Sequence, residues 1–303
     1  MSFTDRLAER ARRARRRVVL PEGDDARVRA AAERLRAIAA VELLDDVRAH
    51  GRRDACVALL RARRPDRFAS DADAAAALSD PLLFAACLVG TGDADVAVGG
   101  VARPTADVVR AALLAVGPAA GITTVSSAFY MTRDDRVLTF ADCGVVPEPS
   151  PAQLAGIALA AVRDRERIVG DVPAVAFLSY STKGSAQGPR VDRVRAAVER
   201  FRALAPECAV DGELQGDAAL VAEVAARKAP GSPVAGRANI LIFPDLDSGN
   251  IAYKLVERLG GWTAYGPILQ GLARPIADLS RGASVDDIVY TTAIAILQCE
   301  DSR

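Results

Sequence analysis

The side chains best suited to chemistry gather in short loops that follow apolar segments. One such loop is 179–185, where the hydroxyls of Ser181 and Thr182 and the ammonium of Lys183 could hold a phosphate group together with backbone amides. The spacing of this loop differs from the P-loop pattern. Ser- and Gly-rich loops between a strand and a helix more often serve only as connections, so the loop by itself does not decide the function.

A second reactive combination lies in the loop 277–284, near the C-terminus. Here the hydroxyl of Ser280 stands beside the guanidinium of Arg281. Such a pair could hold a phosphoryl group together with an oxyanion that develops in a transition state.

Helix capping offers a structural explanation for several polar residues near these loops. In the loop 244–250, two carboxylates and an asparagine could cap a helix through Ser248 or Asp247. Ser284 followed three residues later by Asp287 matches a capping box, in which Asp287 would only close the first turn of a helix. The alternative is that Asp287 is a catalytic base, and the pattern alone leaves both open.

Residue counts exclude several classes of protein. Lys plus Arg and Asp plus Glu are equal at 39 each, so we expect no field broad enough for nucleic acid or a membrane surface. Five scattered cysteines without a CxxC pair argue against a disulfide framework and a zinc site. We expect a reducing, cytoplasmic location, because no apolar signal core accompanies the charged run 10–17. The sole histidine is His50, so a carboxylate is the expected proton carrier.

Short β-branched segments alternate with alanine-rich segments of helical period, which is typical of βαβ units and a mainly parallel sheet. The predicted strands include 18–20, 96–98, 174–178 and 239–243, and the predicted helices include 24–39, 105–116, 153–165, 190–204, 217–228, 250–259 and 285–298. Ligand sites in such folds gather at the carboxyl ends of the strands. A nicotinamide-dependent dehydrogenase would fit this alternation, but no GxGxxG follows the first strand.

The middle of the chain departs from the alternation. Segments 123–131 and 136–141 could pair as antiparallel strands around Asp134 and Asp135, which suggests an insertion and a domain boundary.

Six motifs, taken in their order along the chain, resemble the phosphate acetyltransferase family. They are Leu178-Ser179-Tyr180-Ser181-Thr182-Lys183-Gly184-Ser185-Ala186, Asp211-Gly212-Glu213-Leu214-Gln215, Lys228-Ala229-Pro230-Gly231-Ser232-Pro233-Val234-Ala235-Gly236, Phe243-Pro244-Asp245-Leu246, Gly266-Pro267-Ile268-Leu269-Gln270-Gly271-Leu272 and Asp278-Leu279-Ser280-Arg281-Gly282. Weaker similarity lies in Leu20-Pro21-Glu22 and 105–110.

The resemblance implies an α/β fold of two α/β/α lobes with mainly parallel sheets, similar to isocitrate and isopropylmalate dehydrogenases, with the active site in the cleft between the lobes. We expect one lobe to hold 1–124 and 275–303 and the other to hold 125–274. A homodimer is implied, with no nucleic acid, membrane or metal involved. The implied reaction is acetyl-CoA plus phosphate giving acetyl phosphate plus CoA, reversibly, by direct transfer in a ternary complex. CoA and acetyl-CoA would enter as substrates, and no cofactor would be bound permanently.

The family's catalytic residues match Ser280, Arg281 and Asp287 in this sequence. The resemblance implies that Asp287 takes the proton from the CoA thiol, since the thiolate is the nucleophile. Ser280 would donate a hydrogen bond to the developing oxyanion, and Arg281 would hold the acyl phosphate. Ala283 stands where the family usually has a cysteine, so a thiol at that position cannot be required.

Substrate contacts are also implied. Arg110 matches a family arginine that binds the anionic substrates; the alternative is a solvent-facing helix residue. Arg61 is the better match for a second substrate arginine, and Arg64 is the alternative. The 179–185 loop supplies Ser181, Thr182 and Lys183 as further substrate or CoA contacts.

Two alternatives stay open beside acetyl transfer. One is a phosphate acyltransferase for longer chains such as propionyl or butyryl, because the volume of a pocket cannot be read from a sequence. The other is a non-catalytic acyl-CoA sensor. The physiological direction, the pathway and any effector are not indicated by the sequence.

Overall fold

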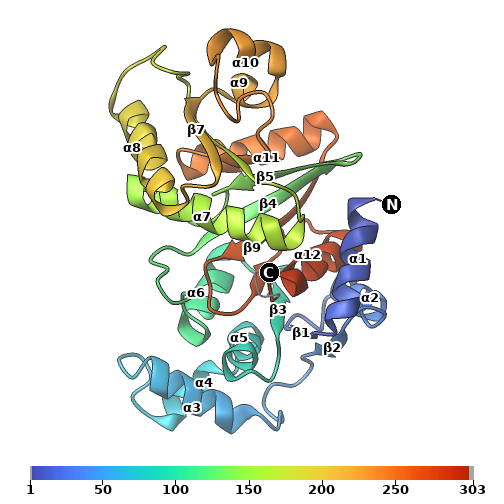
Figure 1. The fold of residues 1–303 in the computed structure, drawn as a ribbon. Coiled ribbons are helices and arrows are strands. Elements are labelled where there is room, and N and C mark those ends of the chain that lie inside the picture. The colour runs from blue at the N-terminus through green and yellow to red at the C-terminus, as the bar shows by residue number, and fades with distance from the viewer. Residues whose placement is uncertain (1, 300–303) are drawn as a thin grey trace. The chain divides into compact units, whose positions relative to one another are not determined.

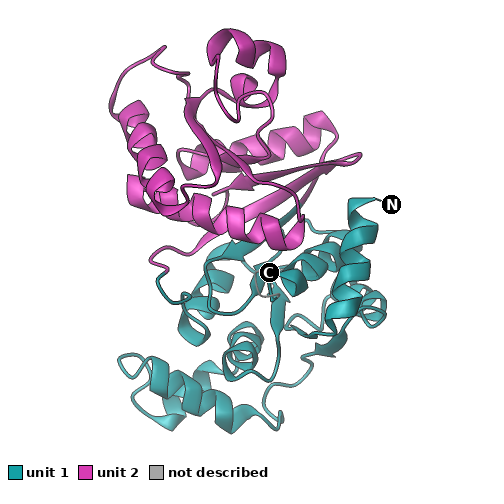
Figure 2. Cartoon of the chain, viewed as in Figure 1, with its two compact units in different colours: residues 1–121, 265–301, 303 teal, residues 122–264, 302 magenta. Residues whose placement is uncertain are grey.

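The computed structural model describes residues 2–299 and divides into two compact units (Figure 2). Unit 1 comprises the described residues of 1–121 and 265–301, and unit 2 comprises 122–264. Unit 1 is therefore discontinuous in sequence, and its final portion carries the Ser280-Arg281 pair.

The strands of unit 1 occur in the order β2-β1-β3-β10-β9. The pairs β1–β2, β1–β3 and β3–β10 are parallel, whereas β9 runs antiparallel to β10. Their bounds are β1 (Arg17–Leu20), β2 (Ala40–Leu43), β3 (Val96–Gly99), β9 (Thr263–Gln270, within this unit from 265) and β10 (Ile276–Asp278). The register places Asp278, at the end of β10, beside Gly99 of β3. The loops that follow these two strands consequently meet.

Two groups of helices pack around this sheet (Figure 1). One group is α3 (Arg53–Arg63), α4 (Asp71–Ala77), α5 (Pro81–Thr91) and α6 (Thr105–Ala115), and the other is α1 (Phe3–Ala14), α2 (Ala26–Leu35) and α12 (Val285–Gln298). α5 and α12 are apolar over most of their length and are buried accordingly. Asp80 and Pro81 start α5, and Gly92 ends it with φ 85°, a conformation that glycine adopts without strain.

Unit 2 has the strand order β4-β5-β8-β6-β7. β4 and β5 form the predicted antiparallel hairpin around Asp134 and Asp135, which is confirmed, while β5–β8, β8–β6 and β6–β7 are parallel. The bounds are β4 (Ser126–Arg133), β5 (Arg136–Ala141), β6 (Ala174–Leu178), β7 (Ala209–Leu214) and β8 (Ile240–Ile242).

Helices cover both faces of the unit 2 sheet. They are α7 (Pro151–Ile168), α8 (Pro189–Leu204), α9 (Gly216–Leu220), α10 (Ala222–Lys228) and α11 (Leu246–Gly260). Alternate residues of β4 point to opposite faces: Phe129 stacks on Tyr253 of α11, whereas Tyr130 is fully buried near Arg165 of α7. This alternation is typical of a sheet that is buried on both sides.

Three predicted helices differ most from those in the structure. The helix predicted over 24–39 begins at Ala26 and ends at Leu35, because the amides of Ile38 and Ala39 both turn back to the Leu35 carbonyl. The helix predicted over 217–228 is interrupted by Val221, whose φ of −116° and ψ of 113° are extended. The helix predicted from Asn250 already begins at Leu246.

Strands β2, β9 and β10 were not among the predicted segments. β2 and β10 each contain a single β-branched residue, whereas the predicted strands 18–20 and 96–98 each contain two.

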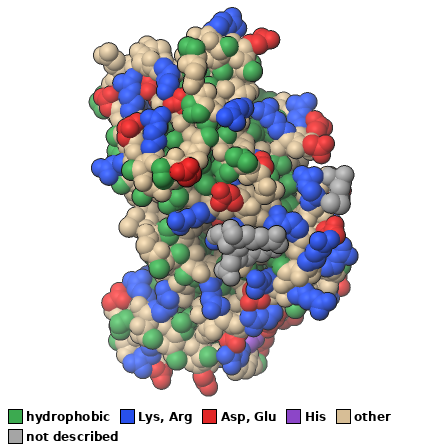
Figure 3. Space-filling model, viewed as in Figure 1, with side chains coloured by type: hydrophobic (Ala, Val, Ile, Leu, Met, Phe, Trp, Pro, Cys, Tyr) green, Lys and Arg blue, Asp and Glu red, His purple; other side chains and the backbone are tan. Residues whose placement is uncertain are grey.

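Charge and hydropathy show no large one-signed or apolar region on the face seen in Figure 3, where basic and acidic side chains are interspersed. In residues 2–299 no single helix has the length and apolar composition to cross a membrane; only α4 with α5, bent by 115°, meets those two criteria as a pair.

Candidate active site

The turn between β10 and α12 carries the predicted catalytic residues in unit 1. The Ser280 carbonyl accepts a hydrogen bond from the Ala283 amide at 2.8 Å, and the Ser280 hydroxyl accepts one from the Gly282 amide at 3.3 Å. Ser280 and Arg281 are exposed. The guanidinium of Arg281 has no hydrogen-bond or ion-pair partner among residues 2–299. A hydroxyl and an unpaired cation therefore face solvent from one tight turn.

Arg27 of α2 holds this turn from behind. Its Nη1 atom donates to the carbonyl oxygens of Arg281 and Ala283, each at 3.0 Å. Asp25, the N-cap of α2, binds the same guanidinium, and this hydrogen bond lowers the pKa of the Asp25 carboxyl and raises that of Arg27. The backbone of the turn is thus fixed by a side chain that the sequence motifs did not reveal.

Glu22 organises the neighbouring loop after β3. Its carboxylate accepts the backbone amides of Gly100, Val101 and Ala102 at 2.7–2.9 Å. Consecutive amides converging on one anion form a nest, which is a favourable place for negative charge. Glu22 belongs to a segment with weak family similarity, and here it fixes the loop that leads into α6.

Asp278 ends β10 beside that loop, and its side chain is fully buried. Its Oδ2 atom accepts a hydrogen bond from the Thr105 hydroxyl at 2.5 Å, whereas Oδ1 has no partner among the described residues. Burial raises the pKa of Asp278 to about 7; the Thr105 hydroxyl and the Leu279 amide oppose this shift, and the charge of Glu22 adds to it. A neutral carboxyl group inside unit 1 is therefore accessible near neutral pH.

Asp287 forms the capping box that its sequence position suggested. Its Oδ2 atom accepts from both the amide and the hydroxyl of Ser284 at 2.8 Å, and the Ser284 hydroxyl accepts from the Asp287 amide at 3.2 Å. Both capping contacts use Oδ2, and Oδ1 has no partner in residues 2–299. The same carboxylate can therefore close the helix and still offer one oxygen to a proton.

The predicted substrate arginines lie elsewhere in unit 1. Arg110 of α6 pairs with Asp107 at 2.7 Å. Arg61, in the last turn of α3, pairs with Asp71 at 2.5 Å, and Arg64 just beyond the helix pairs with Asp66 at 2.9 Å. In the described residues, no hydrogen bond or ion pair joins Arg61, Arg64 or Arg110 to the turn at Ser280.

The loop 179–185 belongs to unit 2, where carboxylates of β7 engage it. The Lys183 ammonium donates to Asp211 at 2.6 Å, and the Ser181 hydroxyl donates to Glu213 at 2.9 Å. The backbone amide of Gln215 donates to the Thr182 hydroxyl at 2.9 Å, and this hydroxyl donates to the side-chain oxygen of Gln215 at 3.4 Å. The polar groups of this loop are therefore bound within their own unit.

Glu213 is the centre of this network. It accepts from Arg195 through both carboxylate oxygens, from the Gly184 amide and from Ser181. Burial alone would raise the pKa of Glu213, but these donors outweigh it and lower the pKa to about 2. Lys183 nevertheless has a φ of 47°, which is uncommon for residues other than glycine and is often found at functional sites.

The loop 244–250 caps α11, but through a residue other than those predicted. Asp245 is the N-cap, and its Oδ1 atom accepts from the Ser248 amide at 2.9 Å. The prediction of Ser248 or Asp247 as the cap was wrong, because both lie inside the first turn of the helix. Asp245 precedes this turn and has the extended conformation that a cap requires.

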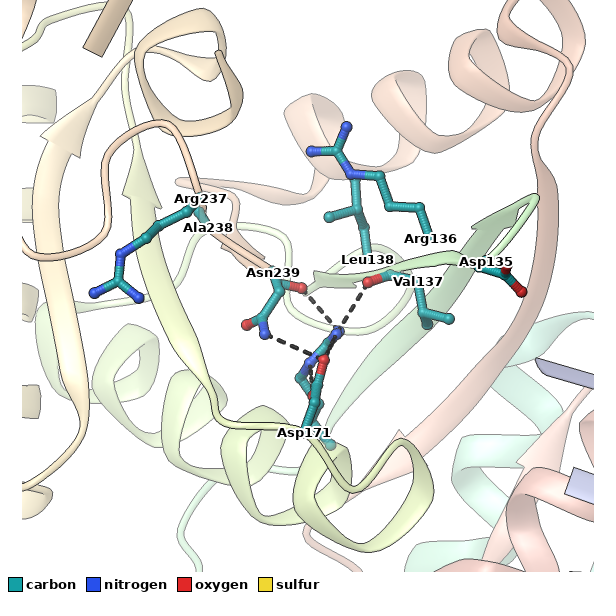
Figure 4. A pocket seen from close by; sticks show the side chains of 9 residues that line it. Asp135, Arg136, Val137, Leu138, Asp171, Arg237, Ala238 and Asn239 are labelled. Carbon is teal, nitrogen blue, oxygen red and sulfur yellow. Dashed lines mark hydrogen bonds and ion pairs between the residues drawn. The ribbon is translucent and has the colours of Figure 1, made fainter. Parts of the chain in front are cut away.

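A cavity of about 330 Å³ lies in unit 2, away from all of these loops (Figure 4). Its lining includes Val137 and Asn239, which stand at the amino ends of β5 and β8. Arg165 lies at its base with 1% of its side chain exposed and binds Asp171, the Thr139 hydroxyl and the carbonyls of residues 137 and 239. Ligand sites of such folds lie at the carboxyl ends of the strands, whereas this cavity lies at their amino ends. We therefore interpret Arg165 as a structural residue that links α7 to β5 and β8.

Within residues 2–299, no three His, Cys, Asp or Glu side chains are grouped so as to hold a metal ion.

Comparison with known proteins gives the family. The family described as phosphate acetyl/butaryl transferase matches residues 37–296. A phosphate acetyltransferase of Paracoccus denitrificans is 47% identical over 98% of this chain and 99% of its own length, and one of Acetivibrio thermocellus is 41% identical over 99% of each. A solved phosphotransacetylase structure from Streptococcus pyogenes has a TM-score of 0.90 at 38% identity and covers 97% of this chain and 98% of that chain. The chain belongs to the phosphate acetyl/butaryl transferase family.

The resemblance recognised from the six motifs is thereby confirmed. The site residues that it predicted can now be compared with their places in the structure. Unit 1 brings Ser280, Arg281 and Asp287 together on one turn and the start of one helix. Sequence reasoning missed Arg27 and the buried state of Asp278. Asp278 lay inside a recognised motif and could have been found there, whereas no local signal connects Arg27 with a turn 254 residues away.

Proposed function

We propose that this member of the phosphate acetyl/butaryl transferase family transfers an acetyl group reversibly between CoA and inorganic phosphate. The observation that carries the proposal is the turn that presents Arg281 beside Ser280, with one oxygen of Asp287 on the next helix; neither the Arg281 guanidinium nor that oxygen has a partner within residues 2–299. Full-length identity of 47% to a phosphate acetyltransferase supports acetyl as the acyl group.

In the proposed direction that forms acetyl-CoA, Asp287 accepts the proton of the CoA thiol. The thiolate attacks the carbonyl carbon of acetyl phosphate, and the C–O bond to phosphate then breaks. Ser280 donates a hydrogen bond to the carbonyl oxygen while it carries negative charge. Arg281 binds the phosphoryl group and offsets the charge of the departing phosphate. In the reverse direction phosphate attacks the thioester, and the leaving thiolate regains its proton from Asp287.

Arg110 and Arg61 are proposed to bind the anionic parts of the substrates. Both arginines are about half exposed and form ion pairs, Arg61 with the exposed Asp71 and Arg110 with the partly buried Asp107, and pairs at the surface contribute about 0–1 kcal/mol. A phosphate group could therefore replace Asp107 or Asp71 at little cost. Arg64 is the alternative to Arg61, and its pair with Asp66 also lies at the surface, although it is somewhat less exposed. Contacts of Ser181, Thr182 and Lys183 with the substrates stay a prediction.

The lobes of a dehydrogenase-like fold and an active site in a cleft between them also stay predictions from the resemblance. We further propose a cytoplasmic enzyme that uses CoA as a substrate and needs no permanently bound cofactor, metal, nucleic acid or membrane.

A homodimer is proposed on the basis of α11. Ile251, Leu255 and Leu259 recur every four residues on this helix and are 56%, 53% and 83% exposed. Such a stripe is typical of a surface that another protein covers, and a second copy of the chain is the occupant that the family resemblance implies.

Acyl transfer is tested by the release of CoA thiol from acetyl-CoA when phosphate is added to the purified protein. EDTA is present throughout, and arsenate serves as a substitute acceptor in a control. We expect phosphate-dependent release that EDTA does not abolish, and propionyl-CoA and butyryl-CoA in parallel reactions give the acyl range. Binding of acetyl-CoA without any release would contradict the proposal and support the sensor alternative.

A further inference from the structure

The end of β10 is tied to two other parts of unit 1 by one side chain. Asp278 bonds to Thr105, the first residue of α6, and lies against the loop that follows β3. A Cβ atom on Gly100 would approach its Oδ1 atom to 2.1 Å, and Gly100 has a φ of 105°. Only glycine allows this close approach. Ser280 and Arg281 follow Asp278 within three residues, so a shift of its carboxyl group would move them.

The surroundings suit a neutral carboxyl group and oppose a charged one. Oδ1 is fully buried and has no hydrogen-bond partner among the described residues, and the nearby Leu279 amide only partly offsets the cost of a buried charge. A protonated carboxyl could instead donate or accept in the 2.5 Å contact with the Thr105 hydroxyl. Glu22, bound to the amides of the same loop, contributes a negative charge nearby.

We propose that Asp278 is a positioning residue for the proposed acyl transfer. Its neutral carboxyl group fixes the position of Ser280 and Arg281 relative to α6 and to the loop at Gly100. The inference rests on the proposed function. Asp278 does not touch substrate in this scheme; it acts through the backbone of the turn, together with the contacts from Arg27.

Ionisation of Asp278 then releases the turn. The elements packed against β10 are β3, β9, α6 and α12, and their ionisable groups are Asp107, Arg110, Tyr265, Asp286, Asp287 and Tyr290; Glu22, Arg27 and Arg103 lie on the adjoining segments. Among them the charge of Glu22 acts on Asp278 and favours its neutral form, in the same direction as burial. As pH rises through about 7, the buried anion would draw in water or move away from Gly100, and Ser280 and Arg281 would lose their alignment.

The test compares Asp278→Asn, which keeps the shape and stays neutral, with the unchanged protein between pH 6 and pH 9. Phosphate and the thiol also change protonation in this range, but they do so equally for both proteins. The ratio of their kcat values is therefore the readout. We expect the ratio of variant to unchanged protein to rise at least about threefold across the range, and Asp278→Ala to lower kcat about tenfold or more at every pH. Asp286→Asn, at an exposed residue of α12, is the control and should give a flat ratio near one.

A flat ratio for Asp278→Asn would overturn the inference while leaving acyl transfer itself established. An unchanged protein without phosphate-dependent thiol release would instead contradict the proposed function. If Asp278→Asn does not fold, hydrogen exchange of residues 279–283 in the unchanged protein decides the matter. Exchange corrected for its intrinsic pH dependence should increase above about pH 7, and constant protection would overturn the inference.

Discussion

Glu213 in unit 2 and Asp278 in unit 1 are both buried carboxyl groups behind loops that follow strands, yet their surroundings differ. Glu213 accepts hydrogen bonds from a guanidinium, a hydroxyl and an amide, and its pKa falls to about 2. Burial raises the pKa of Asp278 to about 7, because the Thr105 hydroxyl and the Leu279 amide do not offset it and the negative charge of Glu22 adds to it. The comparison extends to the cations, because Lys183 is paired with Asp211 whereas Arg281 has no partner in the described residues.

This difference separates polar groups that hold a loop together from polar groups that stay available. A fully paired network stabilises one conformation and leaves no group free to meet a substrate. Polar and charged groups that lack partners make the folded chain less stable. Such groups are concentrated at sites where they bind ligands or take part in reactions. This contrast supports the proposal that the chemistry takes place at the turn of unit 1 and that the network around Glu213 stabilises its own loop.

The largest expected effect concerns Asp287, which has one occupied and one free oxygen. Asp287→Asn keeps an acceptor for the Ser284 amide but cannot take a proton, so kcat should fall by about 10²–10⁴-fold with little loss of stability. Ser284→Ala is the matched control, because it removes the cap and should cost about 1 kcal/mol while kcat changes little. Steady-state kinetics and thermal unfolding of both variants measure this. If Asp287→Asn mainly lowers the melting temperature, Asp287 is only a cap.

The next effect is the dependence of stability on pH that Asp278 causes. Its pKa is raised from 3.8 to about 7 by folding, so its contribution is fully present below about pH 4 and is lost as pH rises through 7. The loss amounts to about 4 kcal/mol at 1.36 kcal/mol per pKa unit. Urea unfolding of the unchanged protein and of Asp278→Asn between pH 5 and pH 8 should therefore give free energies that diverge. If the two free energies changed equally with pH, the pKa of Asp278 would not be raised by folding and the contrast with Glu213 would be wrong.

Glu213 should behave in the opposite sense. Its pKa is lowered from 4.5 to about 2, so its contribution is present above about pH 4.5 and is lost as pH falls through 2. About 3 kcal/mol is expected from this shift. Glu213→Gln should remove most of this acid dependence, and the fluorescence of Trp262, the sole tryptophan and a residue of unit 2, reports the unfolding. Equal acid sensitivity in both proteins would show that the network contributes little.

The smallest of the four effects compares the two cations directly. Arg281→Ala should lower kcat/KM at least about 100-fold, or about 2.7 kcal/mol, because its charge acts on the departing phosphate. Lys183→Met should lower it by less than about tenfold, because the ammonium already neutralises Asp211. A loss of similar size in Lys183→Met would mean that Lys183 exchanges Asp211 for substrate, as the sequence motif suggests. An Arg281→Ala variant within threefold of the unchanged protein would contradict the role of Arg281.

The fold was predictable where local signals are strong. The β4–β5 hairpin, the strands 174–178 and 239–243 and the helix 285–298 follow from periodicity and turn residues, and the structure contains them. Helix ends were less predictable, since Asp245 rather than Ser248 or Asp247 caps α11 and Val221 interrupts a helical pattern. A cap depends on the backbone conformation of one residue, which composition does not fix.

The candidate site was predictable only in part. Ser280, Arg281 and Asp287 lie within eight residues of sequence, and a family motif was enough to single them out. Whether Asp287 caps a helix or accepts a proton could not be decided from spacing, because one oxygen does the first and the other is left for the second.

The sequence by itself determined the family, the alternating α/β pattern and the order of the motifs, because these depend on residue types and on spacing along the chain. Only the tertiary structure decided that Arg27 holds the turn at Arg281 and that Asp278 is buried against Gly100. It also showed that Lys183 is paired with Asp211, whereas Arg281 has no partner in the part of the chain that the structure describes. The reason is physical: burial, pairing and the pKa shifts that follow from them depend on neighbours that are distant in sequence and close in space.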